Sequence, residues 1–290
     1  MNRLGVTPDA PCLALDIGGT KIDTAIVSTT GEISYRKRIQ TQGGDQPLIE
    51  RVVALILETA EQTPFATVGI GCGGPISDGE NRISPLNILE WRNFDLIGPI
   101  SSAVKKPVML DIDTKALALA EGVFGGARDL NNFVSMVVST GIGGGVVIDG
   151  RLLNGAHGNA GHIGHVNVEP NGRLCGCGAR GCLEAEASGT AIASITGKLP
   201  ALADDDIRRR TGQMVGRAVG SVASLLDVEH FFVAGSVALG FGDDFFAAAN
   251  EEAASVAQIS FARGVHIQPS KLVDRGPLVG AACVGWRSQP

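Results

Sequence analysis

Residues 12–28, CLALDIGGTKIDTAIVS, predict two β-strands joined by a tight turn. Apolar and β-branched residues fill both arms, and Gly18-Gly19 lies between them. Because glycine has no Cβ, backbone amides in such a turn can come close to an anion such as a phosphate group. The stretch therefore predicts a β-hairpin with a phosphate-binding turn; the alternative is an ordinary hairpin turn.

The side chains of this turn favour the phosphate interpretation. Thr20 offers a hydroxyl donor, and Lys21 offers a positive charge. Asp16, at the end of the first strand, can hold Mg²⁺ through water, because Mg²⁺ gives up its hydration shell reluctantly. Segment 16–21 is thus a candidate site for a nucleotide phosphate and its magnesium ion.

A second strand–turn–strand pattern covers 133–148, around STGIGGG at 139–145. This turn lacks the GxxxxGK[ST] pattern of a Walker A loop, and no helix follows it where a dinucleotide-binding fingerprint requires one. Two similar halves, each with a phosphate-type hairpin, imply a duplicated α/β protein with a nucleotide cleft between two lobes. The candidate phosphate contacts of the second turn are Thr140, Gly141, Gly143 and Gly144.

The remaining pattern alternates strands and helices. Short apolar strands are expected at 68–71, 107–110 and 231–234, and helical spacing covers 46–62, 114–124, 204–228 and 278–286. We expect an N-terminal lobe at 11–113 and a C-terminal lobe at 114–290. The last helix, 277–288, can pack back on the N-terminal lobe.

Composition excludes several classes of protein. The 290 residues carry a net charge of −6, which argues against a nucleic-acid partner, because phosphate backbones need a basic face. No apolar run reaches the ~18 residues of a membrane span. The first twelve residues lack the apolar core of a signal peptide. Six scattered or clustered cysteines fit a reducing cytoplasm, where we expect the protein to reside.

The run GHVNVEPNGRLCGCGARGC at 164–182 predicts a metal site. His165, Cys175, Cys177 and Cys182 make up a complete tetrahedral ligand set for Zn²⁺. Disulfides or free core cysteines are the alternatives, but three cysteines cannot pair evenly. Since four protein ligands leave no open position, the zinc is expected to be structural, which argues against a zinc hydrolase.

Two acids near the step from strand 107–110 into the next helix are candidates for a catalytic base. Asp113 could accept the proton of an attacking hydroxyl group, as phosphoryl transfer to an alcohol requires. It could equally cap the helix, with Thr114, through the first free amides. Asp111 is the competing carboxylate.

Two further polar residues flank the metal run. Glu184, two positions after Cys182, would be held rigidly by the zinc and could bind a substrate hydroxyl. The alternative is a solvated acid favoured by a helix N-terminus. His162 points either into a polar site or to the surface.

These segments together resemble the ROK family (repressor, open reading frame, kinase) of sugar kinases. The resemblance rests on DIGGTK at 16–21, STGIGGG at 139–145, the run from 164 to 184 and AGS at 234–236, and it spans residues 12 to 286. It implies an actin-like ATPase (ribonuclease H-like) fold with two α/β lobes. It also implies transfer of the γ-phosphate of Mg²⁺-ATP to a sugar 6-hydroxyl group, and a homodimer.

The resemblance also assigns roles by position. Asp113 falls on the catalytic base, and His165 and Glu184 fall on positions that contact the sugar close to the zinc. The other implied sugar-side residues are Gly74, Asn87 and His162, and Gly235 falls on the adenosine side.

Three positions depart from the family pattern. Ile112 and Lys115 stand where most members have asparagine, and an isoleucine cannot bind a sugar hydroxyl group. In GHIGH, His162 replaces the glutamate of glucose-directed members, which resembles the bacterial N-acetylmannosamine kinases. An imidazole can donate where a carboxylate only accepts. We therefore expect a kinase for N-acetylmannosamine or, second, glucose.

The alternative is a sugar-sensing protein on the same fold with weak or no catalysis, which Ile112 and Lys115 favour. The repressor branch of the family carries an N-terminal DNA-binding domain. Here the first phosphate strand begins near residue 12, so no DNA-binding role is expected.

Overall fold

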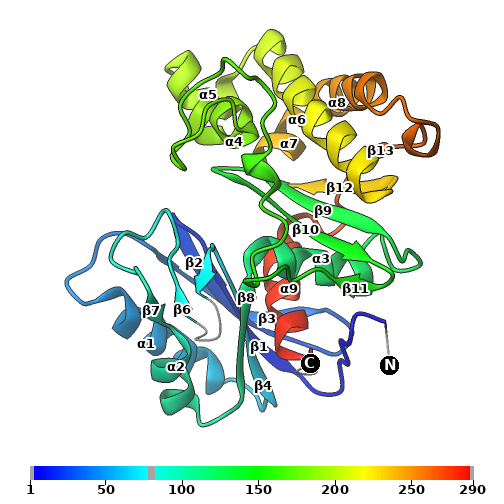
Figure 1. Cartoon of the computed structure of the whole chain (residues 1–290). Helices are drawn as coiled ribbons and strands as arrows, with labels where there is room; N and C mark the ends of the chain where they lie inside the picture. The colour runs from blue at the N-terminus through cyan, green and yellow to red at the C-terminus, as the bar shows by residue number, and fades with distance from the viewer. Residues whose placement is uncertain (1–2, 78–81, 288–290) are drawn as a thin grey trace. The chain divides into compact units, whose positions relative to one another are not determined.

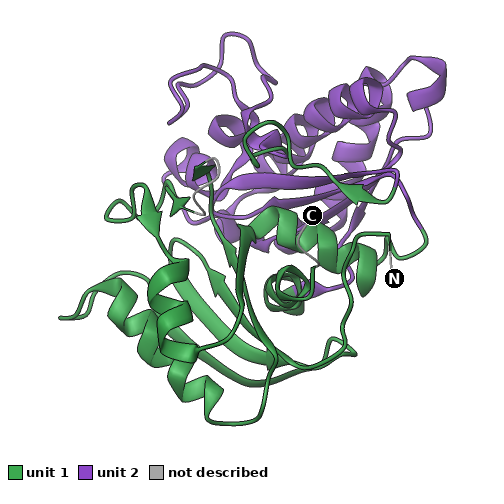
Figure 2. Ribbon diagram, turned by 60° about the horizontal axis from the view of Figure 1, so that its bottom comes forward, with its two compact units in different colours: residues 1–129, 150–160, 274–290 green, residues 130–149, 161–273 purple. Residues whose placement is uncertain are grey.

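The computed structural model describes residues 3–77 and 82–287. Its contacts divide the chain into two compact units, coloured separately in Figure 2. Unit 1 comprises Met1–Asp129, Gly150–Ala160 and Asp274–Pro290, and unit 2 comprises Leu130–Asp149 and Gly161–Val273. The first helix after residue 112, loop 150–160 and the last helix therefore belong to unit 1. Residue 288, the end of the last expected helix, lies outside the described residues.

Unit 1 is built on a five-stranded mixed sheet (Figure 1). Its strands lie in the order β3-β2-β1-β4-β8, with bounds Ile33–Gln40, Lys21–Val27, Cys12–Ile17, Thr67–Cys72 and Val108–Ile112. β1 and β2 form the expected antiparallel hairpin, whereas β1, β4 and β8 run parallel. The carboxyl ends of these three strands therefore meet at one edge of the sheet.

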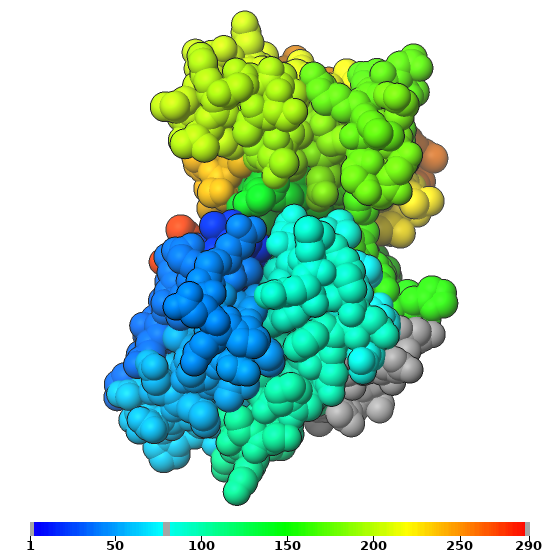
Figure 3. Space-filling model, turned by 90° about the vertical axis from the view of Figure 1, so that its left-hand side faces the viewer, coloured from blue at the N-terminus to red at the C-terminus, as the bar shows by residue number. Residues whose placement is uncertain are grey.

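Helices cover both faces of this sheet. α1 (Leu48–Ala60) and α2 (Ile97–Val104) pack on one face, and α3 (Asp113–Val123) and α9 (Gly276–Gly285) on the other (Figure 1). Figure 3 shows α1, in blue, beside the turquoise segment that ends with α2. A Cβ added to Gly69 in β4 would come within 1.9 Å of a carbonyl oxygen of α9, so glycine permits this close packing.

Four short strands complete unit 1. β5 (Ile76–Ser77), β6 (Arg82–Ile83) and β7 (Phe94–Asp95) form a small antiparallel sheet, and β11 is Arg151–Leu152. The small sheet follows the Gly73-Gly74-Pro75 segment after β4. It brings the expected sugar-side residues of unit 1 into one loop region.

Unit 2 contains the second hairpin, formed by β9 (Phe133–Val138) and β10 (Ile142–Ile148). β12 (His230–Ala234) runs parallel to β9 on one side and to β13 (His266–Pro269) on the other. β10 begins at Ile142, inside the expected turn at 139–145, so Gly143 to Gly145 lie in the strand. A Cβ added to Gly161 would lie 2.2 Å from the carbonyl oxygen of Gly144, so these glycines let segment 161–164 pack against β10.

A pair of long helices dominates unit 2. α6 (Asp205–Leu226) packs along α8 (Asp243–Val256). Gly212, Gly216 and Gly220 repeat every four residues, and a Cβ at each would lie within 3 Å of an α8 atom. The backbones of α6 and α8 therefore approach closely, and α6 forms a firm support for the segments that bind to its side.

The shorter helical segments of unit 2 surround this pair. They are α4 (Leu183–Ala187), α5 (Gly189–Thr196), α7 (Ser236–Phe241) and the turns η1 (Ile163–His165), η2 (Pro200–Leu202) and η3 (Ser260–Ala262), while η4 (Val273–Arg275) follows β13. Among the described residues, helices with the length and apolar character that a bilayer crossing needs are absent.

Candidate functional site

Two acids meet at the carboxyl edge of the sheet of unit 1. The register places Asp16 in β1 beside Gly71 in β4, and Gly71 beside Asp111 in β8. A Cβ on Gly71 would lie 3.5 Å from Cα of Asp113. Because Gly71 has no side chain, β4 places none between Asp16 on β1 and the residues that follow β8. Burial, followed by the charge of Asp113, raises the pKa of Asp16 to about 7. Two partly buried carboxylates that repel each other fit a bound cation.

Asp113 is the first residue of α3. Its Oδ1 accepts a hydrogen bond from the amide of Thr114 at 2.7 Å, and burial raises the pKa of its carboxyl group. The N-cap position is Ile112, whose side chain has no oxygen. Asp113 therefore bonds one first-turn amide from within the helix, as the capping alternative expected, although Ile112 holds the N-cap position. The charge of Asp113 also acts on Asp16, so the two acids are neighbours.

The first glycine turn is held by its own unit. Gly18 donates its amide to the carbonyl oxygen of Lys21 at 3.0 Å, and Thr41 donates its hydroxyl group to the carbonyl oxygen of Gly18 at 2.7 Å. A Cβ on Gly19 would lie 2.5 Å from Cβ of Asn87. The structure thus brings the expected sugar-side residue Asn87 against the expected phosphate turn. Gly74 precedes Pro75 through a cis peptide bond in the neighbouring loop.

Asp111 has a different role from Asp113. It is 2% exposed and forms ion pairs with Lys115 and Arg287, each at 2.8 Å. Because two cations hold its carboxylate, Asp111 is not available to accept a proton from a substrate or to bind one. The structure therefore favours Asp113 over Asp111 as the base.

Lys115 makes a set of contacts that an asparagine could not make. Its ammonium group lies 2.8 Å from Asp111 Oδ1, 3.0 Å from Asn154 Oδ1 and 3.0 Å from the carbonyl oxygen of Gly158. A lysine carries three donors, and here each has an acceptor. The amide of Ile76 donates to Asn159 Oδ1 at 2.9 Å, and Asn159 Nδ2 donates to the carbonyl oxygen of Ile76 at 2.8 Å. Lys115 thus links α3 to the sugar-side loop.

In unit 2, the four expected metal ligands come together. The ligand atoms of His165, Cys175, Cys177 and Cys182 all lie within 4.8 Å of one another. Cys177 Sγ lies 3.7 Å from Cys182 Sγ, and Cys175 Sγ lies 3.7 Å from His165 Nδ1. The edge of a tetrahedron with Zn–S bonds of about 2.3 Å is about 3.8 Å. The donor set therefore fits zinc, and the cysteines are not joined by disulfides.

Burial, and then the neighbouring thiols, raises the pKa of Cys182 to about 12. Burial also raises the pKa of Cys175, whereas a hydrogen bond from the backbone of Ala179 lowers the pKa of Cys177. A cation among these sulfurs would turn them into thiolates. The chemistry of the cluster thus favours a bound metal ion.

Backbone hydrogen bonds close the loop 165–182, which carries the four candidate ligands and is called the metal loop below. The amides of Val168 and Leu183 donate to the carbonyl oxygens of Gly181 and Val166, at 2.8 and 2.9 Å. Gly181 has a φ of +73°, and a Cβ there would lie 1.6 Å from the carbonyl oxygen of Glu169. Only glycine fits this point, so the two arms of the loop lie against each other.

Glu184 joins the metal loop to the second glycine turn. Its Oε2 accepts a hydrogen bond from the amide of Ile142 at 3.0 Å and lies 3.1 Å from a Cβ built on Gly141. The amide of Gly189 donates to the carbonyl oxygen of Ser139 at 2.7 Å, and the Thr190 hydroxyl group donates to that of Thr140 at 2.9 Å. Segment 184–190 therefore holds the turn that is expected to bind phosphate.

The remaining expected residues of unit 2 lie near the same turn. Gly235 has a φ of +102°, and a Cβ there would lie 2.3 Å from the carbonyl oxygen of Val138 at the end of β9. The rings of His162 and His165 are stacked, with centroids 6.0 Å apart, and His162 is exposed. Unit 2 thus holds the second turn, the glycine expected on the adenosine side and the expected sugar-side residues near the candidate metal ligands.

Sequence reasoning missed the supporting residues Thr41, Asn159, Glu186, Arg210 and Arg287. Glu186 is fully buried and bound by two arginines, yet in the sequence it is one of two acids in a short run. Asn159 lies in a loop without periodic pattern. No local signal marks such residues, because their partners lie far away in the chain.

Comparison with known proteins shows the family. The ROK family model matches residues 12–285, which is nearly the whole chain, so this protein belongs to the ROK family. The fold prediction is confirmed: the protein has the two-lobed actin-like ATPase fold of that family.

The relatives include proteins named for each of the two expected sugars. The chain is 33% identical to a glucokinase of Thermotoga maritima, over 96% of this chain and 98% of that protein. It is 36% identical to an N-acetylmannosamine kinase of Haemophilus influenzae, over 80% of this chain and 82% of the other. A ROK glucokinase of Streptomyces griseus, solved with glucose and AMPPNP, superposes with a TM-score of 0.84 at 26% identity and covers 96% of this chain and 100% of its own.

Proposed function

We propose that this protein transfers the γ-phosphoryl group of ATP to the 6-hydroxyl group of a hexose. N-acetylmannosamine is the first candidate and glucose the second. The family and the kinases among its relatives support the reaction class. The observation that carries the proposal is the meeting of Asp16 and Asp113 at the carboxyl edge of parallel strands, beside a glycine turn.

Asp113 acts as the general base. Its carboxylate accepts the proton of the 6-hydroxyl group while that oxygen attacks the γ-phosphorus atom. The new O–P bond forms as the bond between the γ-phosphorus and the β–γ bridging oxygen breaks, and ADP leaves with that electron pair. Burial of Asp113 raises its pKa, which makes it a stronger base than a solvated carboxylate.

The two glycine turns bind the nucleotide phosphates through segments 16–21 and 139–145, and Gly235 lies on the adenosine side. Asp16 would hold Mg²⁺ through water, and the magnesium ion would supply charge neutralisation for the transferred phosphoryl group. Positioning and charge stabilisation provide most of the catalysis in such reactions.

The hexose is bound by Gly74, Asn87, His162, His165 and Glu184, in addition to Asp113. Zn²⁺ held by His165 and the three cysteines would fix the loop that presents His165 and Glu184, as a structural ion outside the chemistry. His162 donates a hydrogen bond where a glutamate would accept one, which favours N-acetylmannosamine. Assembly as a homodimer stays a prediction.

An ADP-release assay over a panel of hexoses tests the proposal. We expect turnover with N-acetylmannosamine or glucose. In the Asp113→Asn variant the turnover rate should fall about a thousandfold, while the variant still binds the sugar. If the variant keeps wild-type turnover, Asp113 is not the base. If the wild type binds a hexose but releases no ADP with any, the protein is the catalytically weak sugar sensor instead.

A further inference from the structure

Glu184 depends on a helix that cannot be stable alone. α4 has five residues, Leu183–Ala187, far fewer than an isolated helix needs. It follows directly on the metal ligand Cys182. A metal ion at this cluster would fix its beginning, and another contact must fix its end.

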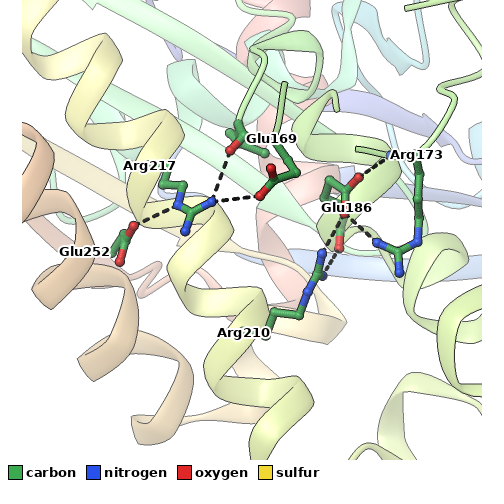
Figure 4. Close-up of polar contacts among 7 residues, drawn as sticks. Glu169, Arg173, Glu186, Arg210, Arg217 and Glu252 are labelled. Carbon is green, nitrogen blue, oxygen red and sulfur yellow. Dashed lines mark hydrogen bonds and ion pairs between the residues drawn. The ribbon is translucent and has the colours of Figure 1, made fainter. Parts of the chain in front are cut away.

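Glu186 supplies this second contact. Its carboxylate is 1% exposed and receives bonds from two sides, as Figure 4 shows. From the metal loop, Arg173 donates its amide to Oε1 and its guanidinium group to Oε2, both at 2.6 Å. From α6, Arg210 donates to Oε2 at 2.6 Å and to the carbonyl oxygen of Glu186 at 2.7 Å. The end of α4 is thus tied to a long helix and to the metal loop at once.

This cluster keeps its charges. Burial alone would raise the pKa of Glu186, but the amide of Arg173 and the guanidinium group of Arg210 outweigh it and lower that pKa. A carboxylate between two guanidinium groups forms strong, directional hydrogen bonds. The position of Glu186 is therefore closely defined.

A neighbouring ion pair on α6 offers a contrast. Arg217 lies two turns further along α6 and bonds Glu252 at 2.8 Å and Glu169 at 3.2 Å (Figure 4). Arg217 also donates to the carbonyl oxygen of Val168 at 3.3 Å, so it contacts the metal loop, but none of these partners belongs to α4. Glu252 is on α8, so its pair with Arg217 joins two helices that already pack closely.

We infer that Glu186 and Arg210 are positioning residues for Glu184, and that they hold α4 independently of the metal ion. The inference rests on the proposed function, in which Glu184 binds the hexose. Because Glu184 Oε2 also accepts the amide of Ile142, a shift of α4 reaches the second glycine turn as well. Glu186 thereby sets the position of a residue shared by the sugar side and the phosphate side of unit 2.

The test uses the full chain with its metal and compares Glu186→Gln, Arg210→Lys and the control Glu252→Gln. Binding of N-acetylmannosamine, glucose and a non-hydrolysable ATP analogue is measured by calorimetry, together with metal content. Glu186→Gln should weaken hexose binding about tenfold and nucleotide binding about threefold, because small misplacements of a binding group are costly. Arg210→Lys keeps the charge without the two-pronged contact and should fall in between. Glu252→Gln should change neither affinity by more than about twofold.

Trypsin provides a readout that needs no substrate. Cleavage after Arg173 should be about tenfold faster in Glu186→Gln than in the wild type, since the glutamine keeps one acceptor oxygen but no charge to pair with the guanidinium group of Arg173. Arg180 lies in the same loop without a bond to Glu186, so cleavage there should change less.

Each outcome decides the inference. Faster cleavage with unchanged hexose and nucleotide affinities would show that Glu186 holds the loop without positioning Glu184. Unchanged cleavage and unchanged affinities would overturn the inference altogether. If the wild type binds neither hexose, the sugar named in the proposed function is wrong. The inference is then tested by nucleotide binding alone: weaker binding in Glu186→Gln supports a role of α4 in placing Glu184 beside Ile142, and unchanged binding contradicts it.

Discussion

The two glycine turns lie in hairpins of the same design but differ in what holds them. In unit 1, the turn after β1 is held by Thr41, which follows the neighbouring strand β3. In unit 2, the turn after β9 is held by Glu184 and segment 189–190, which follow the metal loop. The first turn is supported by its own sheet, and the second by an inserted segment.

Because of this difference, we expect the second turn, but not the first, to depend on a metal ion bound in the metal loop. A disturbance of the metal loop should reach the second turn through α4 and leave the first turn unchanged. Conversely, changes at the titratable groups of unit 1, Asp16 and Lys115, should not affect the metal loop. The chain allows a separate readout, because both of its tryptophans, Trp91 and Trp286, belong to unit 1.

Removal of the metal ion should have the largest effect. A strong chelator should lower the melting temperature of unit 2 by several degrees and abolish measurable hexose binding, because structural zinc contributes directly to folding. Far-UV circular dichroism follows both units, whereas tryptophan fluorescence follows unit 1. We expect the chelator to shift the dichroism transition and leave the fluorescence transition in place. A shift of equal size in both would show that the two units do not respond separately.

Loss of the buried lysine should come next. Lys115→Met leaves Asp111 and the carbonyl oxygen of Gly158 without this donor, and breaking a buried ion pair costs about 3–5 kcal/mol. Urea unfolding followed by tryptophan fluorescence measures this loss in unit 1.

Two comparisons give that measurement its meaning. Lys37→Met, which breaks an ion pair with Glu58 near the surface, should cost less than about 1 kcal/mol. The metal content of Lys115→Met should equal that of the wild type. A Lys115→Met protein as stable as Lys37→Met would contradict the role given to the three acceptors.

The pH dependence of unit 1 should show the raised pKa of Asp16. A carboxyl group whose pKa is about 7 in the folded protein, against about 3.9 in an unfolded chain, favours folding while it is protonated. The free energy of unfolding should therefore fall as the pH rises from about 4 to 7, by roughly 1–3 kcal/mol, and then level off. Urea unfolding without magnesium at several pH values checks this.

A variant at Asp16 separates this group from other titrating groups. Asp16→Asn should reduce the decline and leave the part that comes from Asp113, whose pKa burial also raises. Asp23 provides the opposite case: burial opposes it, but hydrogen bonds from Arg38 and Arg36 lower its pKa, so its stabilisation is present at neutral pH and lost in acid. If Asp16→Asn keeps the wild-type decline between pH 4 and 7, Asp16 is not its source.

Local pattern was enough to predict the frame of this site. Alternating apolar strands around glycines gave both hairpins, and the spacing of one histidine and three cysteines gave a ligand set that the structure brings within 4.8 Å. The end of a strand is harder to predict where a run of glycines extends from the turn into the strand. Gly143 to Gly145 suit a turn and a crowded strand equally, and the contact of segment 161–164 decides for the strand.

The choice between neighbouring acids could not be made from sequence. Asp111 and Asp113 both follow the same apolar run, and they differ in their partners: Asp111 pairs with Lys115, four residues away, and with the distant Arg287. The same holds for Lys115, since Asn154 lies 39 positions away in a loop without periodicity. Such contacts depend on how loops pack, which a one-dimensional pattern does not contain.

A matched pair of threonines tests the comparison of the two turns most directly, with the smallest expected effect. Thr41 donates its hydroxyl group to the carbonyl oxygen of Gly18, and Thr190 donates to that of Thr140, so Thr41→Val and Thr190→Val each remove one similar hydrogen bond. Each loss is worth about 1 kcal/mol, which should weaken binding of an ATP analogue about fivefold. Partial chelation should further weaken nucleotide binding in Thr190→Val more than in Thr41→Val, because only the second turn shares its support with the metal loop. Equal sensitivity of the two variants to the chelator would mean that the inserted segment does not support the second turn in the way its hydrogen bonds indicate.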